Sequence, residues 1–180
     1  MTAPGTSRHV VLYGPPGAGK LTVARALELH HGLRVIHNHL SVDAVLPLFD
    51  FATPAFVELT TDIRMLLYAA AARHRLDVVS TFVDAYGTDD AHLACVLDAA
   101  RSAGAAITLV QLLPSPAALA ERVGGASRIG TKKMTDPAML RRVMVDHDLT
   151  TAAPGTDLTI DNTSISSGAV AALIAAHLGI

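Results

Sequence analysis

A glycine-rich stretch near the amino terminus restricts the folds available to this chain. An apolar run at 10–13, typical of a buried strand, precedes it, and a helical pattern of apolar residues follows it. Strand, glycine-rich loop, lysine and helix in this order form the P-loop arrangement, whose backbone N–H groups and helix N-terminus bind phosphate. We therefore expect a nucleoside triphosphate to be bound by Gly14, Pro15, Pro16, Gly17, Ala18, Gly19, Lys20, Leu21 and Thr22.

The lysine of this loop follows the usual motif, but the residue after it does not. Lys20 is expected to place its charge against the β- and γ-phosphates. Ser or Thr usually comes next and binds Mg²⁺ through its hydroxyl, whereas here the position is Leu21 and Thr22 follows. We therefore expect Mg²⁺ to be held by phosphate oxygens, water and more distant carboxylates, because this ion keeps several of its waters readily.

Strand patterns alternate with helix patterns along the rest of the chain. Strands that are apolar on both faces imply a parallel sheet with helices on both sides. Ligands of such a sheet bind beyond the carboxyl ends of the strands, so the residues that follow the strands are candidates for function. Further strands are predicted at 33–37, 77–83, 105–113 and 158–160. Gly32 is expected to be the C-cap of the first helix, and further helices are predicted at 41–48 (with Ser41 as N-cap), 53–75, 115–123, 136–148 and 166–178. One more helix, capped by 87–90, carries Leu93, Val96 and Leu97.

Composition and charge favour a globular protein and argue against several classes of partner. The 180 residues are 51% apolar and 17% charged, which is typical of one folded domain spanning 1–180. A net charge of -2 argues against a general binder of nucleic acid or of a membrane surface. The first residues lack the apolar core of a signal peptide, and Cys95 lies alone in an apolar helical pattern, where we expect a small buried side chain. We expect a cytoplasmic monomer or homodimer.

Basic residues gather in one segment before the last strand. Six of the fourteen lysines and arginines lie between 122 and 142. Such a segment, interrupted by glycines, can close over phosphates, exclude water and stabilise the charge of a transferred phosphoryl group. We expect a lid over about 122–136, with Arg128 as the catalytic cation and Arg122 and Lys132 as further phosphate contacts.

Polar residues after the second and third strands are candidates for binding a second substrate. His37 and His39 suit a hydrogen bond to substrate or the uptake of a proton, and no third ligand stands at metal spacing beside them. Asp43 suits the role of base toward an attacking hydroxyl, with His39 and Asp84 as alternatives; an acid in the first turn of a helix is the structural alternative for Asp43. Thr81 and Asp84 end the third strand, and Asp84 is a candidate to hold Mg²⁺ through water.

Two further polar residues are candidates for the site. Arg64 falls in a helix among apolar neighbours, so it needs an anionic partner, either a carboxylate of the protein or one of the substrate. Asn162 follows the last strand, where it suits a contact with the nucleobase or a simple turn.

The spelling Gly-Pro-Pro-Gly-Ala-Gly-Lys-x-Thr at 14–22 resembles the P-loop of adenylate kinases, where a non-hydroxyl residue also follows the lysine. The layout of nearly the whole chain resembles the superfamily of nucleoside monophosphate kinases, shikimate and gluconate kinases and chloramphenicol phosphotransferase. The stretch HNHL-x-VD at 37–43 is also similar to a group of uncharacterised small ATP-binding proteins. The resemblance implies a three-layer α/β P-loop NTPase fold with a five-stranded parallel sheet of order 2-3-1-4-5, and an acceptor-side helical insert at about 40–75.

These residues predict a phosphotransferase that uses ATP and Mg²⁺ and moves the γ-phosphoryl group to a small-molecule acceptor. Nucleoside monophosphate kinases bring an arginine to the acceptor phosphate from near the end of the third strand. Residues 81–84 of this chain occupy that place and include no arginine, so a hydroxyl acceptor is favoured over a phosphate. A nucleoside monophosphate kinase, and a nucleotide-binding switch that hydrolyses ATP slowly, stay open as alternatives.

Overall fold

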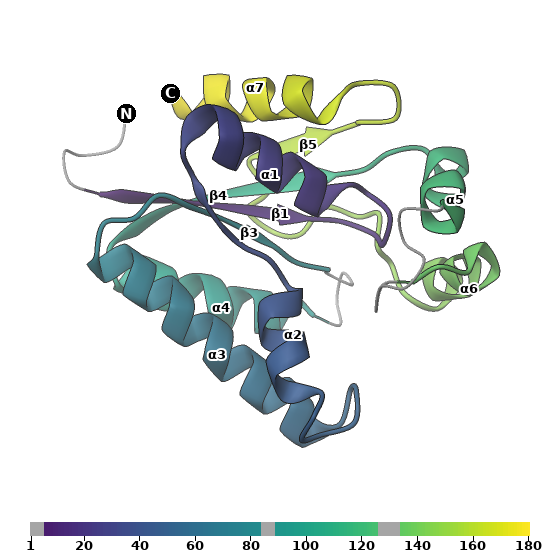
Figure 1. The fold of residues 1–180 in the computed structure, drawn as a ribbon, viewed down its shortest axis with the longest axis horizontal. Coiled ribbons are helices and arrows are strands. Elements are labelled where there is room, and N and C mark those ends of the chain that lie inside the picture. The colour runs from purple at the N-terminus through teal and green to yellow at the C-terminus, as the bar shows by residue number, and fades with distance from the viewer. Residues whose placement is uncertain (1–5, 84–88, 126–133) are drawn as a thin grey trace.

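A parallel sheet forms the centre of the computed structural model, which describes residues 6–83, 89–125 and 134–180 (Figure 1). The order β2-β3-β1-β4-β5 confirms the expected topology, and every neighbouring pair is parallel. In the register, Val10 lies opposite Val79 on one side and Thr108 on the other. The strands are β1 (Ser7–Tyr13), β2 (Arg34–Ile36), β3 (Val78–Thr81), β4 (Ala105–Leu112) and β5 (Leu158–Ile160).

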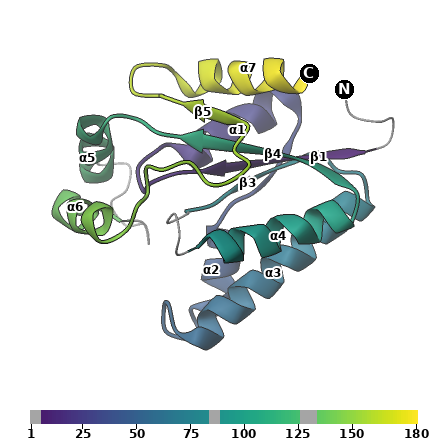
Figure 2. The same cartoon turned by 180° about the vertical axis from the view of Figure 1, so that it is seen from behind.

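Helices cover both faces of the sheet, as apolar residues on both faces of its strands require. Helices α1 (Lys20–His31) and α7 (Ser167–Leu178) lie side by side on one face, and α3 (Pro54–Arg73) and α4 (Asp90–Ser102) lie side by side on the other (Figures 1 and 2). The alternation along β1 divides the core accordingly. Val10 and Leu12 pack in the cluster that includes α1 and α7, whereas Val11 and Tyr13 pack in the cluster that includes α4.

The remaining helices lie toward the carboxyl ends of the strands (Figure 1). These are α2 (His39–Val45), α5 (Pro116–Gly124) and α6 (Pro137–Asp146). Among the residues described, no helix is long and apolar enough to cross a membrane. The helix α2 and the start of α3 share a small apolar cluster of their own, centred on Val42, Val45 and Phe56 and separate from the main core.

Helix ends follow the predicted signals at most positions. The C-cap Gly32 has a left-handed φ of 73°, and its N–H donates to the carbonyl oxygen of Glu28. At the starts of α3, α5, α6 and α7 the N-cap side chain accepts a hydrogen bond from a backbone N–H of the first turn. These caps belong to Thr53, Ser115, Asp136 and Ser166.

Two local predictions are wrong. Helix α2 begins at His39, so Ser41 is not its N-cap; the Ser41 side chain is buried, and its Oγ donates to the carbonyl oxygen of Asn38. Cys95 is exposed on α4, and its Sγ lies 3.8 Å from Sδ of Met65 on α3. In both cases a neighbouring helix decided the environment of the side chain, and local sequence carries no signal for that neighbour.

Candidate active site

The P-loop connects the end of β1 to the start of α1 through three glycines with positive φ. The φ angles are 135° at Gly14, 91° at Gly17 and 89° at Gly19, a region of backbone conformation that other residues rarely adopt. A Cβ on Gly14 would also collide with the carbonyl oxygen of Leu112 on β4. Because β1 and β4 are neighbours, only glycine allows the chain to turn at this point of the sheet.

Lys20 is the first residue of α1, and its side chain folds back over the loop. Its Nζ donates to the carbonyl oxygens of Gly14 and Pro15 at 2.6 and 2.8 Å. The ammonium group is therefore held at the mouth of the loop, where the loop N–H groups and the positive end of the α1 dipole also favour an anion.

The turn after β5 supports the P-loop from behind. Nδ2 of Asn162 donates to the carbonyl oxygen of Ala18 at 2.8 Å, and the Asn162 side chain is almost fully buried. Arg122 of α5 donates to the carbonyl oxygens of Asn162 and Thr163 at 2.7 and 3.2 Å. Asn162 thus braces the loop through a hydrogen bond, and Arg122 connects that brace to the helix that precedes the basic segment.

A cleft of about 930 Å³ leads from the P-loop to α2. Lys20, Leu21, Thr22, Arg122 and Asn162 line its P-loop end. Its other side is formed by the ends of β2 and β3, by α2 and by the loop before α3, and we call this side the α2 wall. The polar part of the α2 wall consists of His37, Asn38, His39 and Thr81. The apolar part consists of Val42, Leu46, Phe51 and Val83.

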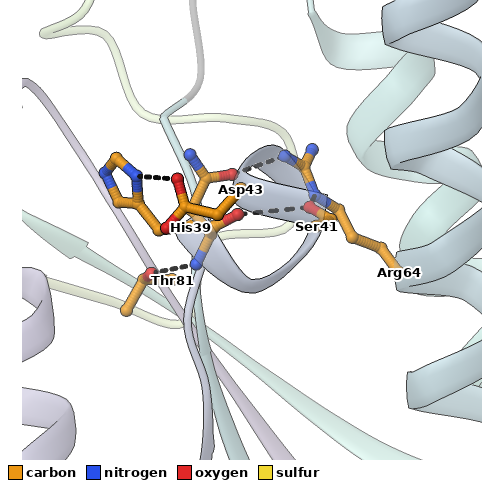
Figure 3. A network of polar contacts seen from close by, with 6 residues as sticks. His39, Ser41, Asp43, Arg64 and Thr81 are labelled. Atoms are coloured by element: carbon orange, nitrogen blue, oxygen red, sulfur yellow. Dashed lines mark hydrogen bonds and ion pairs between the residues drawn. The ribbon is translucent and has the colours of Figure 1, made fainter. Parts of the chain in front are cut away.

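Hydrogen bonds behind the α2 wall hold its polar part in place (Figure 3). The backbone N–H of Asn38 donates to Oγ1 of Thr81 at 3.0 Å, which ties the end of β2 to the end of β3. Arg64 reaches this point from α3: its guanidinium donates to Oδ1 of Asn38 at 2.5 Å and to Oγ of Ser41 at 3.0 Å. One arginine therefore connects α3 to the first turn of α2.

Arg64 has neutral neighbours. The guanidinium lies 5.6 Å from the ring centre of Phe82 and 3.5 Å from Nε2 of His92, and the His92 ring stacks on Phe82. Burial lowers the pKa of Arg64, and burial followed by the charge of Arg64 lowers the pKa of His92. No carboxylate of the described residues forms an ion pair with Arg64. Arg64 is also not among the residues that line the cleft.

The two histidines and Asp43 differ in their positions. His37 and His39 both line the cleft, but from different elements: His37 follows the end of β2 at Ile36, and His39 begins α2. Asp43 is exposed, does not line the cleft, and lies one helical turn after His39, with Oδ1 at 3.8 Å from Nδ1 of that histidine. No group of three metal-ligating side chains occurs in the described part of the chain.

Three of the candidate residues, Asp84, Arg128 and Lys132, lie outside the described residues. Asn38 was not predicted as a site residue, although an amide directly after a predicted strand at the ligand-binding edge of a sheet is a recognisable signal. The apolar part of the α2 wall was not predicted either, and the sequence holds no comparable pattern for it.

Solved structures of kinases share this architecture. A sugar kinase from Janibacter is 17% identical with a TM-score of 0.67, and 97% of this chain and 95% of that chain are covered. The APS kinase of Mycobacterium tuberculosis, solved with AMPPNP and APS, is 16% identical with a TM-score of 0.63 and coverage of 98% and 100%. Shikimate kinase from Acinetobacter baumannii, solved with shikimate, is 15% identical with a TM-score of 0.61 and coverage of 97% and 95%.

No protein-family model matches the sequence, and no curated protein matches it. At these identities, the likeness is one of fold and not of substrate. The strand order, the P-loop between β1 and α1 and the likeness over the full length of these structures agree with one another. This chain therefore has the same three-layer α/β P-loop fold as these solved structures.

Proposed function

We propose that this protein is an ATP-dependent phosphotransferase that moves the γ-phosphoryl group of ATP to a hydroxyl group of a small molecule. One observation carries this proposal: a single cleft of about 930 Å³ joins the P-loop to the α2 wall. A cleft of this size can hold nucleotide phosphates at one end and a second molecule at the other. Phosphoryl transfer needs chiefly such alignment, together with stabilisation of charge.

The P-loop end fits a triphosphate on the geometry of this chain. The three glycines with positive φ let the loop take a conformation in which its backbone N–H groups can bind an anion, and Lys20 adds a full positive charge. Magnesium, when bound, would neutralise negative charge that develops during the transfer. Among the described residues that line the cleft, Glu121 is the one carboxylate, so most ligands of the metal would be phosphate oxygens and water, with Asp84 as the proposed water-mediated partner.

Cations of the basic segment complete the proposed nucleotide site. Arg122 already braces the turn after β5, so its further role is to connect nucleotide binding at the P-loop to the segment that follows α5. Arg128 and Lys132 are proposed to approach the transferred phosphoryl group when the lid closes. Asn162 acts through the P-loop, because its amide nitrogen is engaged by the carbonyl oxygen of Ala18.

The proton of the acceptor is proposed to pass to His39. This histidine lines the cleft, whereas Asp43 lies beside its Nδ1 and away from the cleft, which suits Asp43 to orient the ring rather than to touch the acceptor. In the transfer step the acceptor oxygen bonds to the γ-phosphorus as its proton moves to His39. The bond from that phosphorus to the bridging oxygen breaks, and ADP leaves.

The experiment that tests the proposal is phosphoryl transfer from γ-labelled ATP with Mg²⁺ to a panel of small alcohols, sugars, hydroxy acids, nucleosides and nucleoside monophosphates. Lys20→Ala is the blank, since it removes the loop cation. A labelled product that is absent from the blank supports a kinase and names its acceptor class; a labelled nucleoside diphosphate would favour the nucleoside monophosphate kinase instead. ATP binding with label released only to water would favour the nucleotide-binding switch.

A second experiment separates His39 from Asp43 once an acceptor is known. If His39 takes the proton, His39→Gln lowers kcat by about 100-fold or more, in the range that general base catalysis contributes. Asp43→Asn then lowers kcat by a smaller factor than His39→Gln does. A larger loss for Asp43→Asn than for His39→Gln would reverse the two roles.

A further inference from the structure

We propose that the acceptor is an uncharged alcohol with an apolar body, which packs against Phe51 and Leu46 while its hydroxyl group faces the P-loop. This inference rests on the proposed kinase function and names the chemistry of its second substrate. It follows from the apolar part of the α2 wall, from the absence of a lysine or arginine among its described residues, and from the hydrogen bonds behind it.

The apolar part of the α2 wall exposes a phenylalanine that its neighbours hold in place. Phe51 is 70% exposed, although it lines the cleft. One side of its ring lies against Phe56 with 5.1 Å between ring centres, and Phe56 is buried against Val42 and Val45. The next residue, Ala52, has a left-handed φ of 64°, a conformation that costs energy for a residue with a Cβ. The loop therefore holds a large apolar ring at the edge of the cleft, where an apolar ligand would remove it from water.

Among the described residues, the α2 wall offers no lysine or arginine to an anionic acceptor. Lys20 and Arg122, the cations among the described residues that line the cleft, both belong to its P-loop end. Arg64 lies behind the wall and donates to Asn38 and Ser41. A carboxylate or phosphate placed on the α2 wall would lose water without gaining a positive partner there, which is unfavourable.

The polar part of the α2 wall suits one hydroxyl group better than several. The amide N–H and the side-chain oxygen of Asn38 are already bonded to Thr81 and Arg64. A polyol that lies against the apolar part of the wall would bury hydroxyl groups against Val42, Leu46, Phe51 and Val83, whose side chains offer no hydrogen-bond partner. An alcohol with a single reacting hydroxyl group and an apolar body avoids this cost.

The sequence contains no tryptophan, so Phe51→Trp places one fluorescent reporter in the cleft. The probes are three compounds built on the same six-membered ring: cyclohexylmethanol, cyclohexanecarboxylate and inositol. Each is titrated with and without Mg²⁺ and a non-hydrolysable ATP analogue. We expect saturable fluorescence changes with cyclohexylmethanol at a concentration at least ~10-fold lower than with the carboxylate or the polyol.

The matched control is Leu48→Trp, since Leu48 lies in the same loop, is 69% exposed and does not line the cleft. This variant should show no saturable change with any probe. Thermal unfolding of Phe51→Leu and Phe51→Ser, which carry no tryptophan, supplies a second measurement. Cyclohexylmethanol should raise the unfolding temperature of the wild type and of Phe51→Leu more than that of Phe51→Ser.

Tighter or equal binding of the carboxylate or of inositol, or no saturable change with cyclohexylmethanol, would overturn the inference. These titrations need no turnover, so they separate the inference from the proposed function. If the apolar alcohol binds but the assay with γ-labelled ATP yields no labelled product, the preference of the α2 wall for an apolar alcohol is supported and the kinase proposal is refuted.

Discussion

His9 makes the stability of this protein depend on pH in a way that can be worked out from its surroundings. Its ring lies in β1 and is 1% exposed, with Nε2 at 2.8 Å from Oγ of Ser80 on β3 and with Tyr68 of α3 against it, 4.4 Å between ring centres. Burial lowers the pKa of His9 from 6.5 to about 3. The folded protein therefore keeps His9 neutral at a pH where the unfolded chain protonates it.

The direction and size of the effect follow from proton linkage. A group whose pKa is lowered by folding contributes stability above its unfolded pKa, and that contribution is lost as the pH falls toward its folded pKa. Between pH 6.5 and about 3 the unfolded state binds one more proton at His9, so the free energy of unfolding falls by about 1.4 kcal/mol per pH unit. At about pH 5 the loss relative to neutral pH amounts to roughly 2 kcal/mol.

The measurement is urea unfolding of the wild type and of His9→Gln at about pH 7.5 and about pH 5, which bracket most of this change. His9→Gln removes the titrating ring, so the drop in unfolding free energy between the two pH values should be smaller by about 2 kcal/mol than in the wild type. His9→Asn serves if glutamine does not fit. The exposed His30 on α1 provides the control, and His30→Gln should keep the wild-type pH dependence. An equal drop in the wild type and in His9→Gln would refute the reasoning, since His9 would then not be held neutral by burial.

Three other substitutions test the loop before α3, the P-loop and the α2 wall. Ala52→Gly should raise the free energy of unfolding by about 1 kcal/mol in urea titrations, because glycine adopts the φ of 64° without the Cβ penalty. Asn162→Ala should weaken binding of an ATP analogue by about 5-fold in calorimetry, since the hydrogen bond to Ala18 is lost and such a bond contributes about 1 kcal/mol. Arg64→Lys should speed backbone hydrogen exchange at 38–42, because an ammonium group cannot reproduce the two-pronged contact with Asn38 and Ser41.

Matched controls are available on the same elements. Ala55→Gly, in the first turn of α3, should lower the unfolding free energy where Ala52→Gly raises it. Asp161→Ala leaves the hydrogen bond to the P-loop in place and should bind the analogue like the wild type. Arg73→Lys, exposed at the end of α3, should leave exchange at 38–42 unchanged. If a control variant behaves like its test variant, the effect does not come from the contact or backbone angle named for that test variant.

Much of the fold could be predicted because its signals are local. The strand at 158–160 has the predicted bounds, and 105–113 differs by one residue from β4. Strand 77–83 was predicted too long: the pairing of β3 ends at Thr81, although the apolar pattern continues into Phe82 and Val83. Apolar periodicity marks what is buried, whereas the end of a strand is set by where its neighbour stops pairing.

The candidate site was less predictable on the side of α2. Arg64 was expected to need an anion, but in the described structure it contacts Asn38, Ser41, Phe82 and His92, which come from three other parts of the chain. No spacing in the sequence connects these positions. Their meeting depends on the packing of α3 against both α2 and α4.

The sequence by itself determined the P-loop end of the cleft, because the loop, its lysine and the helix behind it are contiguous and their backbone geometry depends on glycines at 14, 17 and 19. It also determined the sheet, through apolar runs that must be buried on both faces. Only the tertiary structure decided the α2 wall. The strand order brings β2 beside β3, and the bond from Asn38 to Thr81 joins their ends. Helix α3 then places Arg64 behind them, and the loop before α3 places Phe51 at the edge of the cleft. These contacts span up to 43 residues of chain, a distance over which local patterns carry no information.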